Sequence, residues 1–78
     1  QIMFYSFEKR LAMFLHDESI KAKSNVLYVT HEQIAKGVGS AREVVTRMLQ
    51  QFARDKIVAL SRAKIEILDK NALFKIFS

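Results

Sequence analysis

The stretch of sequence that decides the fold is residues 30–60, which read THEQIAKGVGSAREVVTRMLQQFARDKIVAL. Thr30 can cap the N-terminus of a short helix over residues 31–36, and Gln33 at its third position completes a capping box. Gly37-Val38-Gly39 then permits a tight turn, because glycine adopts positive φ at little cost. A short helix followed by a glycine-bearing turn is the first part of a helix-turn-helix.

A longer helix is predicted from Ser40 to about Lys56. Ser40 and Glu43 form a second capping box ahead of an apolar run. One face of this helix is apolar, with Val45, Met48, Leu49 and Phe52 at helical spacing. At about 100° per residue the opposite face carries Glu43, Arg47, Gln50 and Arg54, with Arg42 nearer the flank. This is the strongest amphipathic pattern in the chain.

The residues that follow predict a β-hairpin, which would form a wing. Strands are expected at residues 57–60 and 64–68, joined by residues 61–63, and a further short strand at residues 26–29. Asp69 can cap a last short helix over residues 70–77, which is expected to bury Leu73, Phe74 and Phe77. The predicted fold is mostly α with a small β-hairpin: a winged helix-turn-helix with a three-helix core, a wing and a short C-terminal helix.

The N-terminal part predicts one more helix. Ser6 can cap it, and Phe7, Leu11, Phe14 and Leu15 fall on one face. This helix is expected to run to about Glu18, with a polar connection over residues 19–25. The apolar residues 2–5 either extend the helix and pack on the domain or form an exposed patch that drives a non-native contact.

The composition indicates one small domain with a focused positive charge. The chain has 78 residues and a net charge of +5. Residues 30–64 carry seven basic and three acidic side chains, so most of the excess lies in the helix-turn-helix and wing. A focused positive field favours a polyanion, either nucleic acid or a membrane surface. The absence of cysteine excludes disulfides and cysteine metal sites, and no apolar run could span a bilayer.

Several segments carry a family resemblance. They are THEQIA at residues 30–35, GVGSAREVVTRML at 37–49, Phe52, IVAL at 57–60, KIEILD at 64–69, and Arg10-Leu11-Ala12 with Phe14-Leu15 near the start. Together they resemble the DNA-binding domain of the Crp/Fnr family of bacterial transcription regulators. The Ala-Arg-Glu-Val-Val-x-Arg run is the most specific part, and the resemblance covers about nine-tenths of the chain.

The resemblance implies a homodimer in the full-length protein that binds a two-fold symmetric site on double-stranded DNA. The family's domain follows an effector-sensing β-barrel and a long dimerisation helix, and neither is expected in this chain, which begins at Gln1. We therefore expect a fragment without a cofactor. Residues 1–5 would be the tail of the connection from the dimerisation helix, and residues 6–78 the DNA-binding domain, with the helix-turn-helix at about 30–56 and the wing at about 57–68. RNA polymerase is a further expected partner, the cytoplasm the expected location, and no membrane contact is expected.

The resemblance places the helix from Ser40 in the major groove. The family's base-reading positions match Arg42, Glu43 and Arg47. Arginine donates two hydrogen bonds to guanine, and glutamate accepts one from cytosine N4. Val44 stands where the family often has Thr or Ser, and it offers an apolar contact, such as to a thymine methyl. The alternative is a solvated helix face with a Glu43–Arg47 ion pair.

Six further residues are candidate phosphate contacts: Thr30, His31, Ser40, Ala41 (through its backbone amide), Arg62 and Lys64. Two helices are predicted to begin at Thr30 and Ser40, and helix N-terminal amides favour phosphate oxygens. The alternative for Thr30 and Ser40 is capping alone, and for the wing residues it is a solvated turn charge. The family often has glycine where Ala63 stands, which leaves the turn type of the wing open.

No pattern in the sequence supports an enzyme or a metal site. His16 lies beside Asp17 and Glu18 and is expected at the surface, and zinc would need three or four ligands at suitable spacing. The predicted function is sequence-specific binding of double-stranded DNA, as the output domain of a Crp/Fnr-type regulator. The alternative is a winged helix used for protein–protein contact, which predicts an apolar or acidic exposed face on the helix from Ser40.

Overall fold

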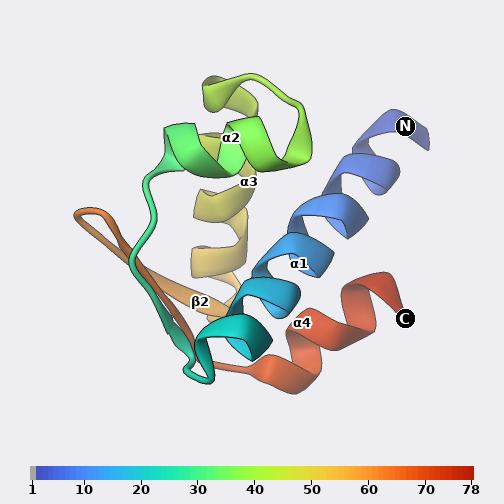
Figure 1. The fold of residues 1–78 in the computed structure, drawn as a ribbon. Helices are drawn as coiled ribbons and strands as arrows, with labels where there is room; N and C mark the ends of the chain where they lie inside the picture. The colour runs from blue at the N-terminus through green and yellow to red at the C-terminus, as the bar shows by residue number, and fades with distance from the viewer. Residues whose placement is uncertain (1) are drawn as a thin grey trace.

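The computed structural model describes the backbone of residues 2–78 and the side chains of residues 7–78. Its elements follow the order α1 (Ile2–Ala22), β1 (Val26–Leu27), α2 (His31–Val38), α3 (Arg42–Arg54), β2 (Val58–Ser61), β3 (Lys64–Ile67) and α4 (Lys70–Phe77). In Figure 1, α1 and α4 lie side by side, while the β2–β3 hairpin projects on the opposite side of the molecule. The predicted winged helix-turn-helix is confirmed.

The first helix is longer than predicted at both ends. Ser6 lies inside α1 and does not cap it, because no helix-breaking residue precedes it. Residues 19–22 are helical as well, and the buried Ser19 donates its hydroxyl to the His16 carbonyl at 2.7 Å. The chain leaves the helix only at Lys23, which has a φ of 53°. The apolar run at residues 2–5 extends the helix, but its predicted packing or exposure lies outside the described side chains.

The first half of the helix-turn-helix follows the prediction closely. Thr30 Oγ1 accepts from the Gln33 amide at 3.1 Å, and Gln33 Oε1 accepts from the Thr30 amide at 2.9 Å, so the capping box is confirmed. The helix runs two residues further than expected. Gly37 is therefore helical, and the turn depends on Gly39, whose φ of 68° is left-handed.

The predicted capping box at Ser40 and Glu43 is wrong. The N-cap of α3 is Ala41, which makes no side-chain cap, and the helix begins at Arg42. Ser40 instead caps the C-terminal end of α2, because its backbone amide donates a hydrogen bond of 3.0 Å to the Ala35 carbonyl. The turn between α2 and α3 is therefore one residue longer than predicted, because α3 is capped at Ala41 and not at Ser40. At its other end α3 stops at Arg54, two residues earlier than expected.

The predicted hairpin is confirmed and belongs to a three-stranded antiparallel sheet with strand order β1-β3-β2. Leu27 and Leu60 both pair with Ile65, and Val58 pairs with Ile67, so the apolar residues share one face of the sheet. The strand predicted at residues 26–29 is shorter than expected. The hairpin turn holds Ala63 at a φ of 52°, a conformation in which glycine is favoured.

The core lies between the four helices and the inner face of the sheet. Its largest fully buried side chains are Leu11, Leu15, Ile34, Val45, Leu49, Phe52, Val58, Ile65 and Leu73. The predicted stripe of α3 is buried except for Met48, which is partly buried. Asp69 caps α4 as predicted and accepts from the Ala72 amide at 3.0 Å.

One side chain predicted for the core is outside it. Phe74 is 49% exposed, and its ring lies 5.2 Å from that of Phe77 and 5.8 Å from that of His16. His16 is partly buried rather than at the surface, because α4 brings these two aromatic rings against it. Within residues 2–78, no helix combines the length and the hydropathy needed to cross a membrane.

Candidate nucleic-acid interface

A surface hollow lies where the start of α2, the start of α3 and the wing turn meet. Its volume is about 400 Å³, and it is lined by Thr30, His31, Glu32, Arg42, Ser61, Arg62 and Ala63. Three of the predicted phosphate contacts and one predicted base reader therefore surround the same space, although they come from three separate segments. Ser40, Ala41 and Lys64 do not line it.

The predicted base readers stand on the exposed side of α3. Arg42, Glu43 and Arg47 are exposed, and Val44 is 38% exposed. Their position follows from the burial of Val45, Leu49 and Phe52, which turns the rest of the helix outward. In the described part of the chain the ion pairs lie on α1, so the Glu43–Arg47 pair of the alternative interpretation is not formed.

The start of α3 leaves backbone donors without a side-chain partner. The first amides of a helix have no carbonyl within the helix to bind, and Ala41 supplies no side-chain cap. Negative charge is favoured at such an end, and a phosphate oxygen can accept from these amides. The failure of the predicted Ser40 cap therefore makes this end of α3 better suited to an anion.

Thr30 combines the two roles that the sequence left as alternatives. Its Oγ1 atom accepts from the Gln33 amide at 3.1 Å, which uses a lone pair of the hydroxyl. The hydroxyl proton stays available as a donor. Capping and phosphate binding are therefore compatible at this residue, which lines the hollow and is exposed.

His31 connects the two helices of the helix-turn-helix. Its Nδ1 atom lies 2.9 Å from Thr46 Oγ1 on α3, at hydrogen-bond distance. Burial lowers the pKa of the His31 imidazole, and the nearby charge of Arg42 lowers it further. The free protein therefore holds this ring mainly neutral at pH 7. Sequence reasoning missed Thr46, because only the packing of α2 on α3 brings together residues that lie 15 positions apart.

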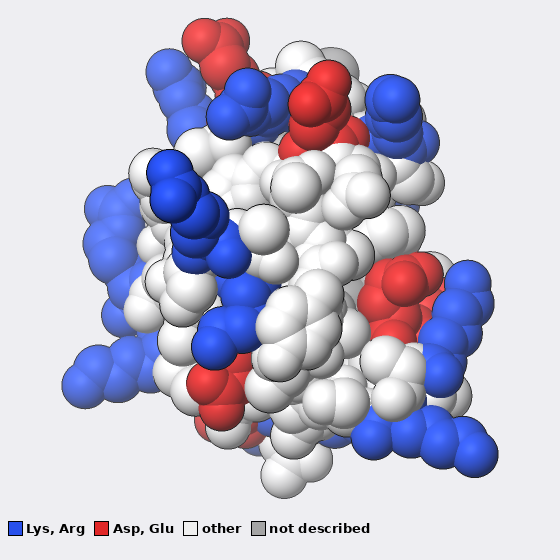
Figure 2. All heavy atoms as spheres, turned by 60° about the vertical axis from the view of Figure 1, so that its left-hand side comes forward, with Lys and Arg blue, Asp and Glu red and all other residues white. Residues whose placement is uncertain are grey.

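Basic side chains surround the face that carries the wing. Figure 2 shows Lys and Arg side chains spread around this face, with a few acidic groups between them and a largely uncharged centre. Within the hollow, Arg42 and Arg62 are accompanied by one carboxylate, that of Glu32. The local field is therefore positive where three elements converge, which favours a polyanion.

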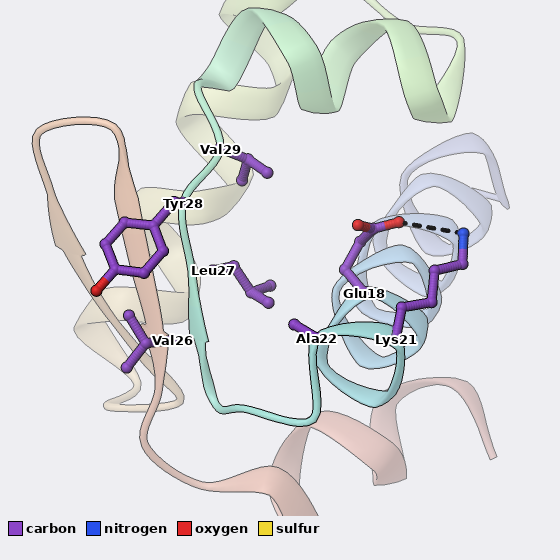
Figure 3. Close-up of a pocket in the computed structure, with 7 residues that line it drawn as sticks. All are labelled: Glu18, Lys21, Ala22, Val26, Leu27, Tyr28 and Val29. Atoms are coloured by element: carbon purple, nitrogen blue, oxygen red, sulfur yellow. Dashed lines mark ion pairs between the residues drawn. The ribbon is translucent and has the colours of Figure 1, made fainter.

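A second hollow, of about 330 Å³, lies between the end of α1 and β1. Figure 3 shows Leu27 and Val29 pointing toward α1, while Tyr28 points to the opposite side of the strand. Glu18 and Lys21 form an ion pair at its edge, with a distance of 3.5 Å between their charged groups. Across residues 7–78 no group of three or more His, Asp or Glu side chains is placed to hold a metal.

Comparisons with known proteins identify the family of this chain. Residues 9–76 match the family of Crp-like helix-turn-helix domains. The chain is 38% identical over 58 residues to the transcriptional regulator SdrP of Thermus thermophilus, a match that covers 74% of this chain and 27% of that protein. It is 35% identical over 52 residues to the global nitrogen regulator of Synechococcus elongatus, which covers 67% of this chain and 23% of that protein.

The structure is also similar to solved structures. A transcriptional regulator of the Crp/Fnr family from Eubacterium rectale superposes with a TM-score of 0.91 at 48% identity, over 99% of this chain and 36% of that one. A second Crp/Fnr regulator, TTHA1359 of Thermus thermophilus, gives a TM-score of 0.84 at 30% identity, over 90% of this chain and 39% of that one. The chain thus spans about a quarter to two-fifths of the length of these relatives.

Proposed function

This chain belongs to the Crp-like helix-turn-helix family, and from that membership we propose that α3 enters the major groove of double-stranded DNA while the hollow beside it holds the backbone. The chain is the DNA-binding output domain of a Crp/Fnr-type transcription regulator.

Base reading is assigned to the exposed side chains at the start of α3. Arg42 and Arg47 each donate a pair of hydrogen bonds to guanine, Glu43 accepts from a cytosine amino group, and Val44 contacts a thymine methyl. The exposure of all four side chains supports this assignment. Docked recognition helices commonly contact base edges with residues near their N-terminus, and these four lie in the first two turns of α3.

Backbone contacts are assigned to the segments around the hollow. The observation that carries the proposal is that Thr30, His31 and Arg62 line the same space as Arg42, at the place where α2, α3 and the wing meet. Phosphate contacts fix the register of a protein on the duplex. Ala41 and Ser40 at the start of α3, and Lys64 on the wing, would contact neighbouring phosphates.

The wider assembly is also part of the proposal. The full-length protein would be a homodimer that presents two copies of α3 to half-sites about one helical turn apart, with RNA polymerase as a further partner in the bacterial cytoplasm. The relatives are named as transcriptional regulators, and an enzymatic role is not proposed. The alternative use, as a protein–protein module, needs an apolar or acidic face on α3. The exposed residues of α3 include Arg42, Arg47 and Arg54, which argues against it.

The salt dependence of DNA binding tests the proposal. Anisotropy of a labelled random duplex is measured between about 50 and 200 mM salt, and log affinity should fall by about 0.9 per log unit of salt for each phosphate neutralised. The double variant Arg62→Gln/Lys64→Gln, at two proposed phosphate contacts, should reduce this slope by about two. Lys70→Gln/Lys75→Gln, which removes the same charge from exposed residues of α4, is the matched control. Equal slopes for the two variants would contradict the proposed face.

A further inference from the structure

The contact between His31 and Thr46 sets the orientation of an imidazole at the edge of the hollow. The Nδ1–Oγ1 distance is 2.9 Å, and His31 is one of the residues that line the hollow. With Nδ1 engaged by Thr46, Nε2 is the ring nitrogen that remains for a ligand. Thr46 is partly buried on α3, so its hydroxyl is held by the packing of that helix on α2.

A hydroxyl partner is compatible with both protonation states of the ring. When the imidazole is neutral with its proton on Nε2, the Thr46 hydroxyl can donate to Nδ1. When the imidazole is protonated on both nitrogens, the same oxygen can accept from Nδ1–H. A carboxylate in this place would favour the charged ring, and an ammonium group would favour the neutral one. Thr46 therefore fixes the ring without fixing its charge.

The charged groups beside His31 come from every element that forms the hollow. Glu32 lies on its own helix, Arg42 on α3 and Arg62 on the wing turn. In the free protein, burial of the ring and the charge of Arg42 oppose its protonation. A bound phosphate reverses this balance, because a negative charge next to the imidazole favours its protonated form.

We propose that Thr46 positions the His31 imidazole so that Nε2 donates to a DNA phosphate seated in the hollow beside Arg62, and that this phosphate draws a proton onto the ring, so that DNA binding tightens as the pH falls. This inference rests on the proposed function, since it requires DNA in the hollow. It adds a positioning residue and a proton linkage to the backbone contacts.

The direction of the pH dependence follows from linkage. In the free protein the pKa of His31 lies below its ordinary value of about 6.5. In the complex the phosphate raises it, so DNA binding takes up a proton between the two pKa values. In that window the affinity should rise by up to about tenfold for each unit that the pH falls. Above the pKa of the complex, the affinity should no longer change with pH through His31.

The test measures the affinity of the chain for a random duplex between about pH 5 and pH 8 at constant ionic strength. His31→Gln keeps a hydrogen-bond donor that does not titrate, so its affinity should change less with pH than that of the wild type. Thr46→Val keeps the shape of the side chain and should weaken binding by about three- to tenfold at low pH while reducing the pH dependence. Thr46→Ser restores the hydroxyl and should restore both. His16→Gln, which changes the other histidine, should keep the full pH dependence.

A second readout separates positioning from folding. Nuclear magnetic resonance of the His31 ring nitrogens should show a higher pKa with duplex than without it, and thermal unfolding should show that the Thr46 variants are folded. The inference is overturned if the pKa of His31 does not rise on binding, or if His31→Gln keeps the wild-type pH dependence. If duplex affinity falls steeply with salt concentration but is unchanged in His31→Gln, this inference fails and the proposed function still stands. Absence of duplex binding would remove both.

Discussion

Phe14 of α1 lies against Gly37 of α2, with its ring in the space that a side chain at position 37 would occupy. A Cβ atom added to Gly37 would stand 2.9 Å from Phe14 Cζ, which is closer than carbon atoms pack. Gly37 is helical and has no left-handed backbone. This glycine therefore serves the close approach of α2 to α1, while Gly39 makes the turn.

The first prediction concerns this contact. Alanine normally stabilises a helix by about 1 kcal/mol relative to glycine, but overpacking a well-packed contact costs about 1–3 kcal/mol. Gly37→Ala should therefore lower the free energy of unfolding by about 1 kcal/mol. In a Phe14→Leu background, which lacks the ring atoms that clash, the same substitution should instead raise it. Chemical denaturation of the four proteins in this cycle measures both values, and an equal effect of Gly37→Ala in the two backgrounds would contradict the contact.

Local features of the fold can be predicted from the sequence, whereas features that depend on tertiary contacts, such as the close approach of Phe14 to Gly37, cannot. The caps at Thr30 and Asp69 were predictable, because each hydrogen bond joins residues three positions apart. The stripe of α3 and the wing were predictable from their periodicity. The start of α3 was not, because the amide of Ser40 serves the end of α2 and shifts the next helix by one residue.

The candidate site was predictable in its members but not in its arrangement. Arg42, His31 and Arg62 were identified by residue type and by resemblance, and the structure brings them to one hollow. The bond from His31 to Thr46 has no local signal, because it depends on how α2 crosses α3. The exposure of Phe74 likewise depends on tertiary packing, since α4 buries Leu73 and turns the next residue outward.

The second prediction concerns the wing turn, where Ala63 has a φ of 52°. A residue with a Cβ atom pays about 1–2 kcal/mol to adopt the left-handed region. Glycine avoids that cost, but it loses more conformational entropy than alanine when the chain folds. Ala63→Gly should therefore raise the free energy of unfolding by about 0.5–1 kcal/mol, which is a rise of a few degrees in Tm. Ala53→Gly, inside α3, is the control and should lower it by about 1 kcal/mol. A destabilised Ala63→Gly protein would be inconsistent with this turn geometry.

The third prediction separates the two roles of Thr30. Aspartate is as good an N-cap as threonine, so Thr30→Asp should keep the free energy of unfolding within about 0.5 kcal/mol of the wild type. The new carboxylate removes the hydroxyl donor and repels phosphate, so affinity for a random duplex should fall by about tenfold or more. Thr30→Asn keeps the cap without the charge and should lose less affinity. Thermal unfolding and anisotropy measure the two properties, and unchanged DNA binding in Thr30→Asp would place Thr30 outside the interface.

The last prediction tests base reading at Arg47, which is exposed on α3 and makes no ion pair in the described part of the chain. The proposed hydrogen bonds from Arg47 to guanine would form only on the recognised sequence. Arg47→Ala should therefore lose about 1–3 kcal/mol on a duplex selected from a random library, with relaxed specificity at one base pair and a smaller loss on random duplex. Arg62→Ala, at a proposed phosphate contact, should instead lose about the same on both duplexes and lower the salt slope by about one. If Arg47→Ala behaved in the same way as Arg62→Ala, Arg47 would be a backbone contact and not a base reader.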